Sequence, residues 1–158
     1  MSSCLTPLLP YSLTPWFDAD GEENPRSKWS DTGREKAARG EDGLYPWGNS
    51  APEHDLAYFD HADAGTTSQI GRRPGGASIY GCHDLAGNVW EWTLDSFNDE
   101  RELHVLKGGS WQNPATHLEN GARLFSYPPA KRRTYMGFRV VYLPADLYAT
   151  YMAAYEQR

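Results

Sequence analysis

The tripeptide Trp90-Glu91-Trp92 constrains the fold more than any other feature of this chain, because it places a carboxylate between two large rings. The surrounding letters, NVWEWT, alternate between apolar and polar residues and predict a strand from Asn88 to Thr93. In a strand, the two tryptophans share one face and Glu91 points to the other. The rings can then fill a core, whereas a buried Glu91 carboxylate requires a partner of opposite charge.

The composition predicts a single loop-rich domain rather than a helical bundle. The chain has 158 residues, enough for one domain with its own core. Aromatic residues make up 13% of it and apolar residues only 39%, with 15 glycines and 11 prolines. The formal charge of −6 argues against a nucleic-acid partner, and no apolar run is long enough to predict a membrane span.

The pattern of short elements predicts an α+β fold. Residues 1–29 are broken by prolines and form an expected extended leader, followed by a domain over residues 30–158. Thr32 and Glu35 form a capping box, which predicts a short helix over residues 33–39. Two further strands are expected at 103–109 and 136–143, and an amphipathic helix is expected in the tail.

The two cysteines, Cys4 and Cys82, form no recognisable disulfide framework or metal motif. This cysteine usage is compatible with a reducing compartment. The first residues lack the basic segment of a secretory signal, and three prolines interrupt them. We therefore expect a cytoplasmic protein.

Five motifs occur in order along the chain: EKAARG at 35–40, YPWGN at 45–49, GNVWEWTLD at 87–95, VLKGGSW at 105–111 and GFRVV at 137–141. Together they resemble the formylglycine-generating-enzyme or sulfatase-modifying-factor family, a branch of the C-type lectin fold. The resemblance runs from about Trp29 to Leu143. It implies one α+β, C-type-lectin-like domain with a small antiparallel sheet, few short strands and helices, and long loops. It also implies that the N-terminal part of the family domain is shortened or missing, so a second chain could complete the fold.

Two departures from the family pattern bear on activity. The resemblance places the two copper-binding cysteines of the formylglycine-generating enzymes at Asn113 and Leu118, which cannot supply the thiolates that Cu(I) prefers. We therefore expect no copper and no formylglycine chemistry. The tryptophan that usually precedes EKAARG is replaced here by Arg34.

The resemblance also implies a structural calcium ion at the turn before the WEW motif. Its ligands would be the side chains of Asp84 and Glu91 and the backbone carbonyls of Gly87 and Val89. The alternative is that Glu91 pairs with an arginine such as Arg139 or Arg123, while Asp84 caps a turn. The family's other calcium site is expected to be lost, because Tyr58 stands where it needs an asparagine.

The long segment from Ser110 to Phe138 is the expected ligand-binding surface, because function concentrates in loops on a rigid scaffold. An ordinary solvated loop is the alternative. The family resemblance extends to the variable proteins of diversity-generating retroelements, which display a binding surface in this region. The residues that we expect to contact a protein or small-molecule ligand are Gln112, Asn113, Thr116, His117, Glu119, Asn120, Phe125, Tyr127, Arg132 and Tyr135.

Two hypotheses of function follow. The first is a non-catalytic ligand- or protein-binding module. The alternative is an oxidoreductase, or an auxiliary subunit of one, that acts on sulfur substrates by formylglycine generation or sulfoxide synthesis and is completed by a partner chain. The histidines lack the spacing of a transition-metal site. The GRRPGG segment at 71–76 lacks the GK[ST] ending of a phosphate loop.

Overall fold

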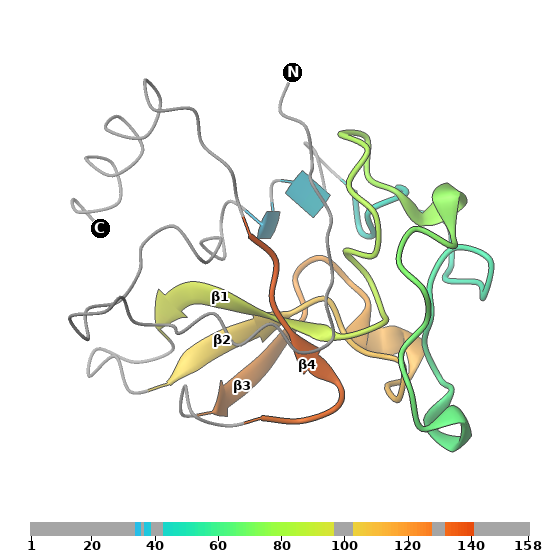
Figure 1. Cartoon of the computed structure of the whole chain (residues 1–158). Coiled ribbons are helices and arrows are strands. Elements are labelled where there is room, and N and C mark those ends of the chain that lie inside the picture. The colour runs from blue at the N-terminus through green and yellow to red at the C-terminus, as the bar shows by residue number, and fades with distance from the viewer. Residues whose placement is uncertain (1–33, 36, 39–42, 97–102, 128–131, 141–158) are drawn as a thin grey trace.

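A computed structural model describes residues 34–35, 37–38, 43–96, 103–127 and 132–140 of the chain (Figure 1). The predicted leader and the predicted tail helix lie outside these residues. Within the predicted helix, the four described residues, Arg34, Glu35, Ala37 and Ala38, are α-helical. In the described part of the chain, no helix has the length and apolar character needed to cross a membrane.

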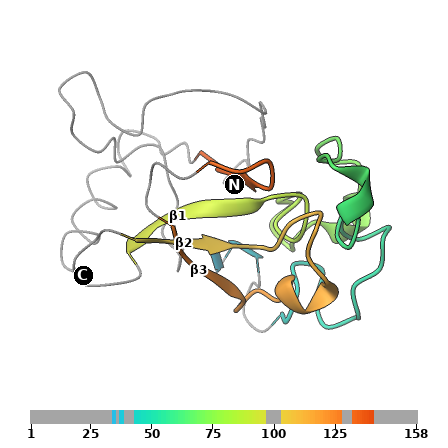
Figure 2. The same cartoon turned by 90° about the horizontal axis from the view of Figure 1, so that it is seen from below.

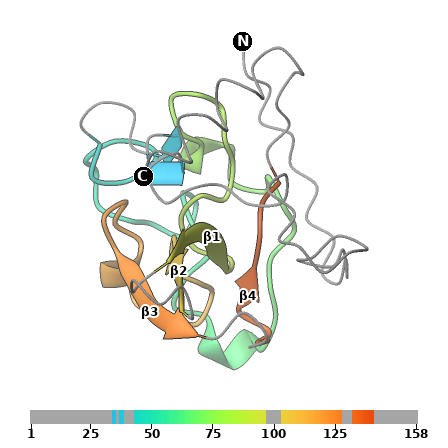
Figure 3. The ribbon, with the colours of Figure 1, turned by 90° about the vertical axis from the view of Figure 1, so that its left-hand side faces the viewer.

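One small sheet has the order β3-β2-β1-β4, which Figure 3 shows with β1 between β2 and β4. Its strands are β1 (Trp90–Ser96), β2 (His104–Lys107), β3 (Arg123–Tyr127) and β4 (Met136–Gly137). β2 runs antiparallel to β1 and β3, but β4 runs parallel to β1. The expectation of a purely antiparallel sheet is therefore wrong, because the chain crosses from one sheet edge to the other between β3 and β4.

The predicted strand boundaries differ from the observed ones for a physical reason. Asn88 was expected to begin a strand, but its backbone N–H donates to the Tyr58 carbonyl and its carbonyl accepts from the Trp111 N–H. These loop contacts hold Asn88 at a positive φ of 60°, so the strand begins two residues later. β3 was not expected as a strand, since its residues were assigned to the long loop after Ser110.

The tryptophan faces are as the alternation predicts. Trp90 and Trp92 form one buried cluster with Leu106, against which Leu124, Tyr135, Met136 and Phe138 pack. Glu91 lies on the other face, where its Cα pairs with that of Lys107. Both of these charged residues are fully buried, so this face of the sheet holds charged side chains away from water.

The loops gather beyond one end of the strands, as Figures 1 and 2 both show. They contain three short 3-10 turns: η1 (Ala62–Ala64), η2 (Pro74–Gly76) and η3 (Ala115–His117). A second core cluster lies beneath the loops and consists of Tyr45, Ala57, Phe59, Ala86 and Leu118. Asn88 joins three loop segments, because its side chain also accepts from the Ser68 N–H at 2.9 Å. The long connections are thus held by specific buried contacts.

Cys82 is buried and disulfide-bonded. The other cysteine of the chain, Cys4, lies outside the described residues. A disulfide is typical of an oxidising compartment, so it argues against the reducing compartment that the cysteine usage suggested. The cytoplasmic location stays a prediction.

Candidate functional site

The carboxylate of Glu91 lies between two arginine side chains. Arg34 Nε donates to Glu91 Oε2 at 2.8 Å, and Arg139 Nη2 donates to Glu91 Oε1 at 2.7 Å. The exposed fractions of Glu91, Arg34 and Arg139 are 1%, 2% and 8%, so all three charges are removed from water. Burial acts to raise the pKa of Glu91, but the charges and hydrogen bonds of Arg139 and Arg34 outweigh it and hold that pKa below its ordinary value.

The same two guanidinium groups bind backbone oxygens of the segment that leads into β1. Arg34 Nη2 donates to the Leu85 carbonyl at 2.7 Å, and Arg139 Nη2 donates to the His83 carbonyl at 2.8 Å. Gly108 leaves the space for Arg34, because a Cβ at that position would lie 2.3 Å from Arg34 Nη2. Two arginines from distant parts of the chain therefore hold both the carboxylate and the backbone of this turn.

This arrangement favours the arginine alternative over a calcium ligand at Glu91. Both carboxylate oxygens already accept hydrogen bonds from guanidinium groups, and a metal ion there would face two like charges. The Asp84 carboxylate accepts the Gly71 N–H at 2.7 Å, a contact between two loop segments. No group of three histidine, cysteine, aspartate or glutamate side chains converges within the described residues. The calcium site formed by Asp84, Gly87, Val89 and Glu91 stays a prediction.

Asn113 and Leu118, which stand where the resemblance places the copper cysteines, have structural roles in this chain. Asn113 Oδ1 accepts hydrogen bonds from Trp90 Nε1 at 2.7 Å and from Ser110 Oγ at 2.5 Å. Leu118 is 1% exposed and belongs to the core beneath the loops. The His117 ring meets Trp90 edge-on, with 6.0 Å between ring centroids. The two positions expected for thiols therefore hold a hydrogen-bonded amide and a buried aliphatic side chain.

The expected ligand-binding residues are not equally accessible. Thr116 and Arg132 are exposed, whereas Gln112, Asn113, His117, Glu119 and Tyr135 are half-buried. Asn120 is buried, and its Nδ2 donates to the Gly43 carbonyl at 2.9 Å, so it anchors the loop instead of facing a ligand. Phe125 and Tyr127 lie on β3, and their side chains are outside the described part of the structure.

Comparison with known proteins identifies the family. The model of the sulfatase-modifying factor enzyme 1-like domain matches residues 7–143. This chain belongs to that family. Its structure is similar to that of Treponema denticola variable protein 1, with a TM-score of 0.64 and 25% identity over 78% of this chain and 51% of the other. The expected α+β, C-type-lectin-like fold is thereby confirmed.

Two curated relatives carry different names. The chain is 29% identical over 119 residues to a hercynine oxygenase of Mycolicibacterium thermoresistibile, covering 62% of this chain and 26% of the relative. It is 32% identical over 120 residues to the inactive Cα-formylglycine-generating enzyme 2 of Bos taurus, covering 66% of this chain and 40% of the relative. The chain thus spans about a quarter to two fifths of the length of these relatives.

Sequence reasoning missed the part played by Arg34. Its replacement of the usual family tryptophan was visible, but the partner that it serves was not. Two sequence features together could have indicated the contact. A buried carboxylate needs a positive partner, and Arg34 places a positive charge where the family has an apolar tryptophan. Arg139 was among the partners considered for Glu91, and the hydrogen bonds confirm it.

Proposed function

We propose that this chain is a non-catalytic ligand- or protein-binding module. Its binding surface comprises the accessible residues of the segment 112–135, with Gln112, Thr116, His117 and Arg132 as the principal contacts. Family membership supports the scaffold. The similarity to a variable protein supports the use of this scaffold for display.

The observation that carries the proposal is the chemistry at Asn113 and Leu118. A copper oxidase of this family would need two thiolates there, but Asn113 has its amide oxygen engaged twice and Leu118 is buried. Its similarity to an inactive formylglycine-generating enzyme, at 32% identity, is in keeping with a loss of activity.

The base of the proposed surface is held in place by backbone hydrogen bonds. Trp111 N–H donates to the Asn88 carbonyl at 2.9 Å, and the Asn113 carbonyl accepts from the Asp60 N–H at 2.9 Å. Polar side chains such as Gln112 and Thr116 therefore extend from a fixed frame. Such a frame lowers the entropy lost on binding, which is the physical advantage of a preorganised binding loop.

A direct test of this proposal uses selection against a defined library. The immobilised chain would be panned against a phage-displayed library of random dodecapeptides, in parallel with a Gln112→Ala/Thr116→Ala/Arg132→Ala variant. We expect a shared peptide motif that binds the wild-type chain and loses affinity at least tenfold for the variant, because truncation removes accessible polar contacts. Equal affinity for both chains, with matched far-UV circular dichroism, would place binding elsewhere and refute the proposed surface.

The second assay asks for enzymatic activity. A sulfatase-derived peptide containing cysteine would be incubated with the chain, Cu(I) and oxygen, and formylglycine would be measured by mass spectrometry. We expect no turnover above the metal-only control. Robust turnover would contradict the non-catalytic proposal.

The alternative function is an auxiliary subunit of an oxidoreductase that acts on sulfur compounds, with a partner chain supplying the metal ligands. The similarity to a hercynine oxygenase favours this candidate. It predicts that the purified chain binds Fe(II) only when its partner is present. Stoichiometric Fe(II) binding by the isolated chain would contradict the requirement for metal ligands from a partner chain.

A further inference from the structure

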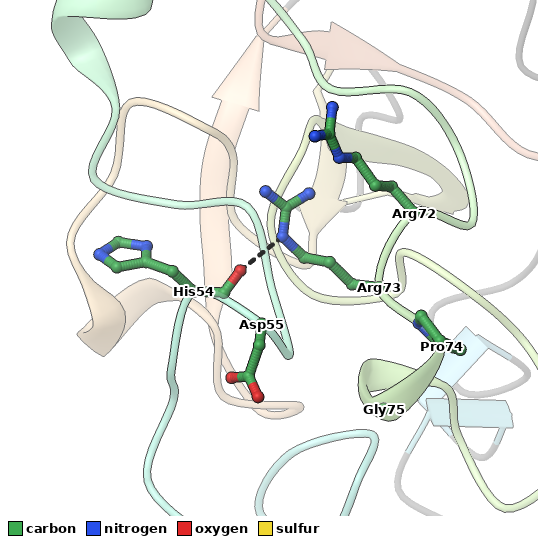
Figure 4. Close-up of a pocket in the computed structure, with 6 residues that line it drawn as sticks. All are labelled: His54, Asp55, Arg72, Arg73, Pro74 and Gly75. Atoms are coloured by element: carbon green, nitrogen blue, oxygen red, sulfur yellow. Dashed lines mark hydrogen bonds between the residues drawn. The ribbon is translucent and has the colours of Figure 1, made fainter.

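A separate pocket lies among the loops, outside the segment 112–135. It has a volume of about 430 Å³ and is open to solvent (Figure 4). Its lining residues come from two segments that are distant in sequence: His54, Asp55, Arg72, Arg73, Pro74 and Gly75. This volume falls within the range of small-molecule sites.

Arg73 is fixed at this pocket by three contacts. Its Nε donates to the His54 carbonyl at 2.7 Å, and its Nη1 donates to Ser68 Oγ at 2.8 Å. The guanidinium carbon also lies 4.7 Å from the centroid of the Tyr58 ring. These contacts orient the guanidinium plane before any ligand arrives, and they leave Nη2 without a hydrogen bond within the described residues.

Stacked rings support this position. The His54 ring stacks on Phe59 and lies 4.7 Å from the centroid of His61, which in turn stacks on Tyr58 at 4.5 Å. Phe59 is 7% exposed and anchors this row of rings in the core. The pocket wall is therefore rigid even though it is made of loops, and such rigidity favours specific binding.

The charges at the pocket are not balanced within it. Arg72 is exposed, and across the described ranges its guanidinium forms no hydrogen bond or ion pair. The Asp55 carboxylate points away from both guanidinium groups in Figure 4, and no ion pair joins it to either among the described residues. Two positive side chains thus line one pocket that contains a single carboxylate, in a chain whose net charge is −6.

We propose that this pocket binds a small molecule through a carboxylate group held by Arg72 and Arg73. Guanidinium groups match the two oxygens of a carboxylate and form strong charge-assisted hydrogen bonds with it. Asp55 lines the same pocket, and its negative charge disfavours a phosphate dianion more than a singly charged carboxylate. The binding surface at 112–135 plays no part in this site.

The test is an NMR titration of the folded chain with sodium acetate, observed at the Arg73 Nε–Hε resonance. The hydrogen bond from Nε to His54 makes that resonance a reporter within the pocket wall. Sodium chloride and sodium phosphate at equal ionic strength serve as the comparison. We expect a saturable shift with acetate, no matching shift with chloride, and weaker binding of phosphate than of acetate.

Substitutions assign the effect to the pocket. Arg72→Gln should weaken acetate binding on the order of tenfold, because it removes a charged donor. Arg72→Lys should weaken it less, since the charge remains while the fork geometry is lost. Arg133→Gln, the same charge change at an exposed residue outside the pocket lining, should leave acetate binding unchanged.

Several results would overturn the proposal. Identical shifts with chloride and acetate would show only ionic-strength effects, and tighter binding of phosphate would contradict the carboxylate assignment. Unchanged affinity in Arg72→Gln, or its loss in Arg133→Gln, would exclude this pocket. Because Arg72 is exposed, the Arg72→Gln chain is expected to fold, which its amide spectrum would verify.

Discussion

The Glu91→Gln substitution tests how this fold manages its buried charges. Gln has nearly the shape of Glu, so packing against the sheet is retained while the negative charge is lost. Arg34 and Arg139, exposed by only 2% and 8%, would then face a neutral amide at hydrogen-bond distance. Their two positive charges would remain buried and would lose the carboxylate that both of them contact.

The expected loss of stability is large. Breaking a buried ion pair by removing one partner costs about 3–5 kcal/mol, because the remaining charge stays desolvated. Domains of this size have a free energy of unfolding of about 5–15 kcal/mol, so the substitution removes a substantial part of it. At roughly 2–4 °C per kcal/mol, the melting temperature should fall by about 10 °C.

Urea denaturation followed by tryptophan fluorescence would measure the change, with Glu53→Gln as the matched control. Glu53 is exposed, so its replacement should change the free energy of unfolding by less than about 0.5 kcal/mol. A double-mutant cycle with Arg34→Met measures the interaction energy between Arg34 and Glu91. The double variant should lose less stability than the sum of the two single variants, since Arg34 and Glu91 are in direct contact.

The stabilising role of the Glu91 charge would be refuted if Glu91→Gln unfolded at the same urea concentration as the wild-type chain. It would also be refuted by additive effects in the cycle, which would mean that the contact between Arg34 and Glu91 carries no coupling energy. Calcium provides an independent check. A strong chelator should leave the wild-type melting temperature unchanged, because the arginines already balance Glu91. A drop of several degrees would support the calcium site instead.

Three further predictions concern pH and the loops. The lowered pKa of Glu91 means that its contribution to stability is complete above the unfolded glutamate pKa of about 4.3 and is lost as pH falls towards its folded pKa; acid titration of unfolding should show a shallower decline in Glu91→Gln. Asn88→Ala should cost about 2–4 kcal/mol by urea denaturation, since it removes the Ser68 hydrogen bond at a positive φ, and a cost below 1 kcal/mol would contradict this. Gly76→Ala should destabilise the chain severely because its Cβ would lie 1.7 Å from the Leu56 carbonyl oxygen, whereas Gly121→Ala meets open space and should be nearly neutral in a thermal melt.

The sequence was most informative where a pattern repeats. Alternation at Trp90, Glu91 and Trp92 predicted the strand, the core face and the buried charge, because successive side chains of a strand point to opposite faces of the sheet. The ordered motifs predicted the family that residues 7–143 match. These features depend on neighbours in the chain, which sequence reasoning can see.

Long-range contacts were harder to predict. Arg34 meets Glu91 across 57 positions, and no local pattern encodes that distance. β3 was missed because the residues before Pro128 resembled a polar loop, although pairing with β2 makes them a strand. The pocket at Arg72 and Arg73 depends on His54 and Tyr58, whereas the sequence around the arginines showed only that the segment is not a phosphate loop. In each case, a tertiary contact determined the role.

The arginine pair at Glu91 also has a consequence for the order in which this chain is completed during synthesis. Arg34 leaves the ribosome early, Glu91 in the middle, and Arg139 near the end of the described residues. A nascent chain that stops before Met136 therefore has a Glu91 carboxylate with only one of its two cations, and it also lacks the parallel strand β4 at the sheet edge. Such a fragment has an unpaired strand edge and a buried carboxylate with incomplete charge balance. Exposed strand edges of this kind promote aggregation. The sheet edge and the charge balance at Glu91 are thus completed together, when β4 and Arg139 have been synthesised.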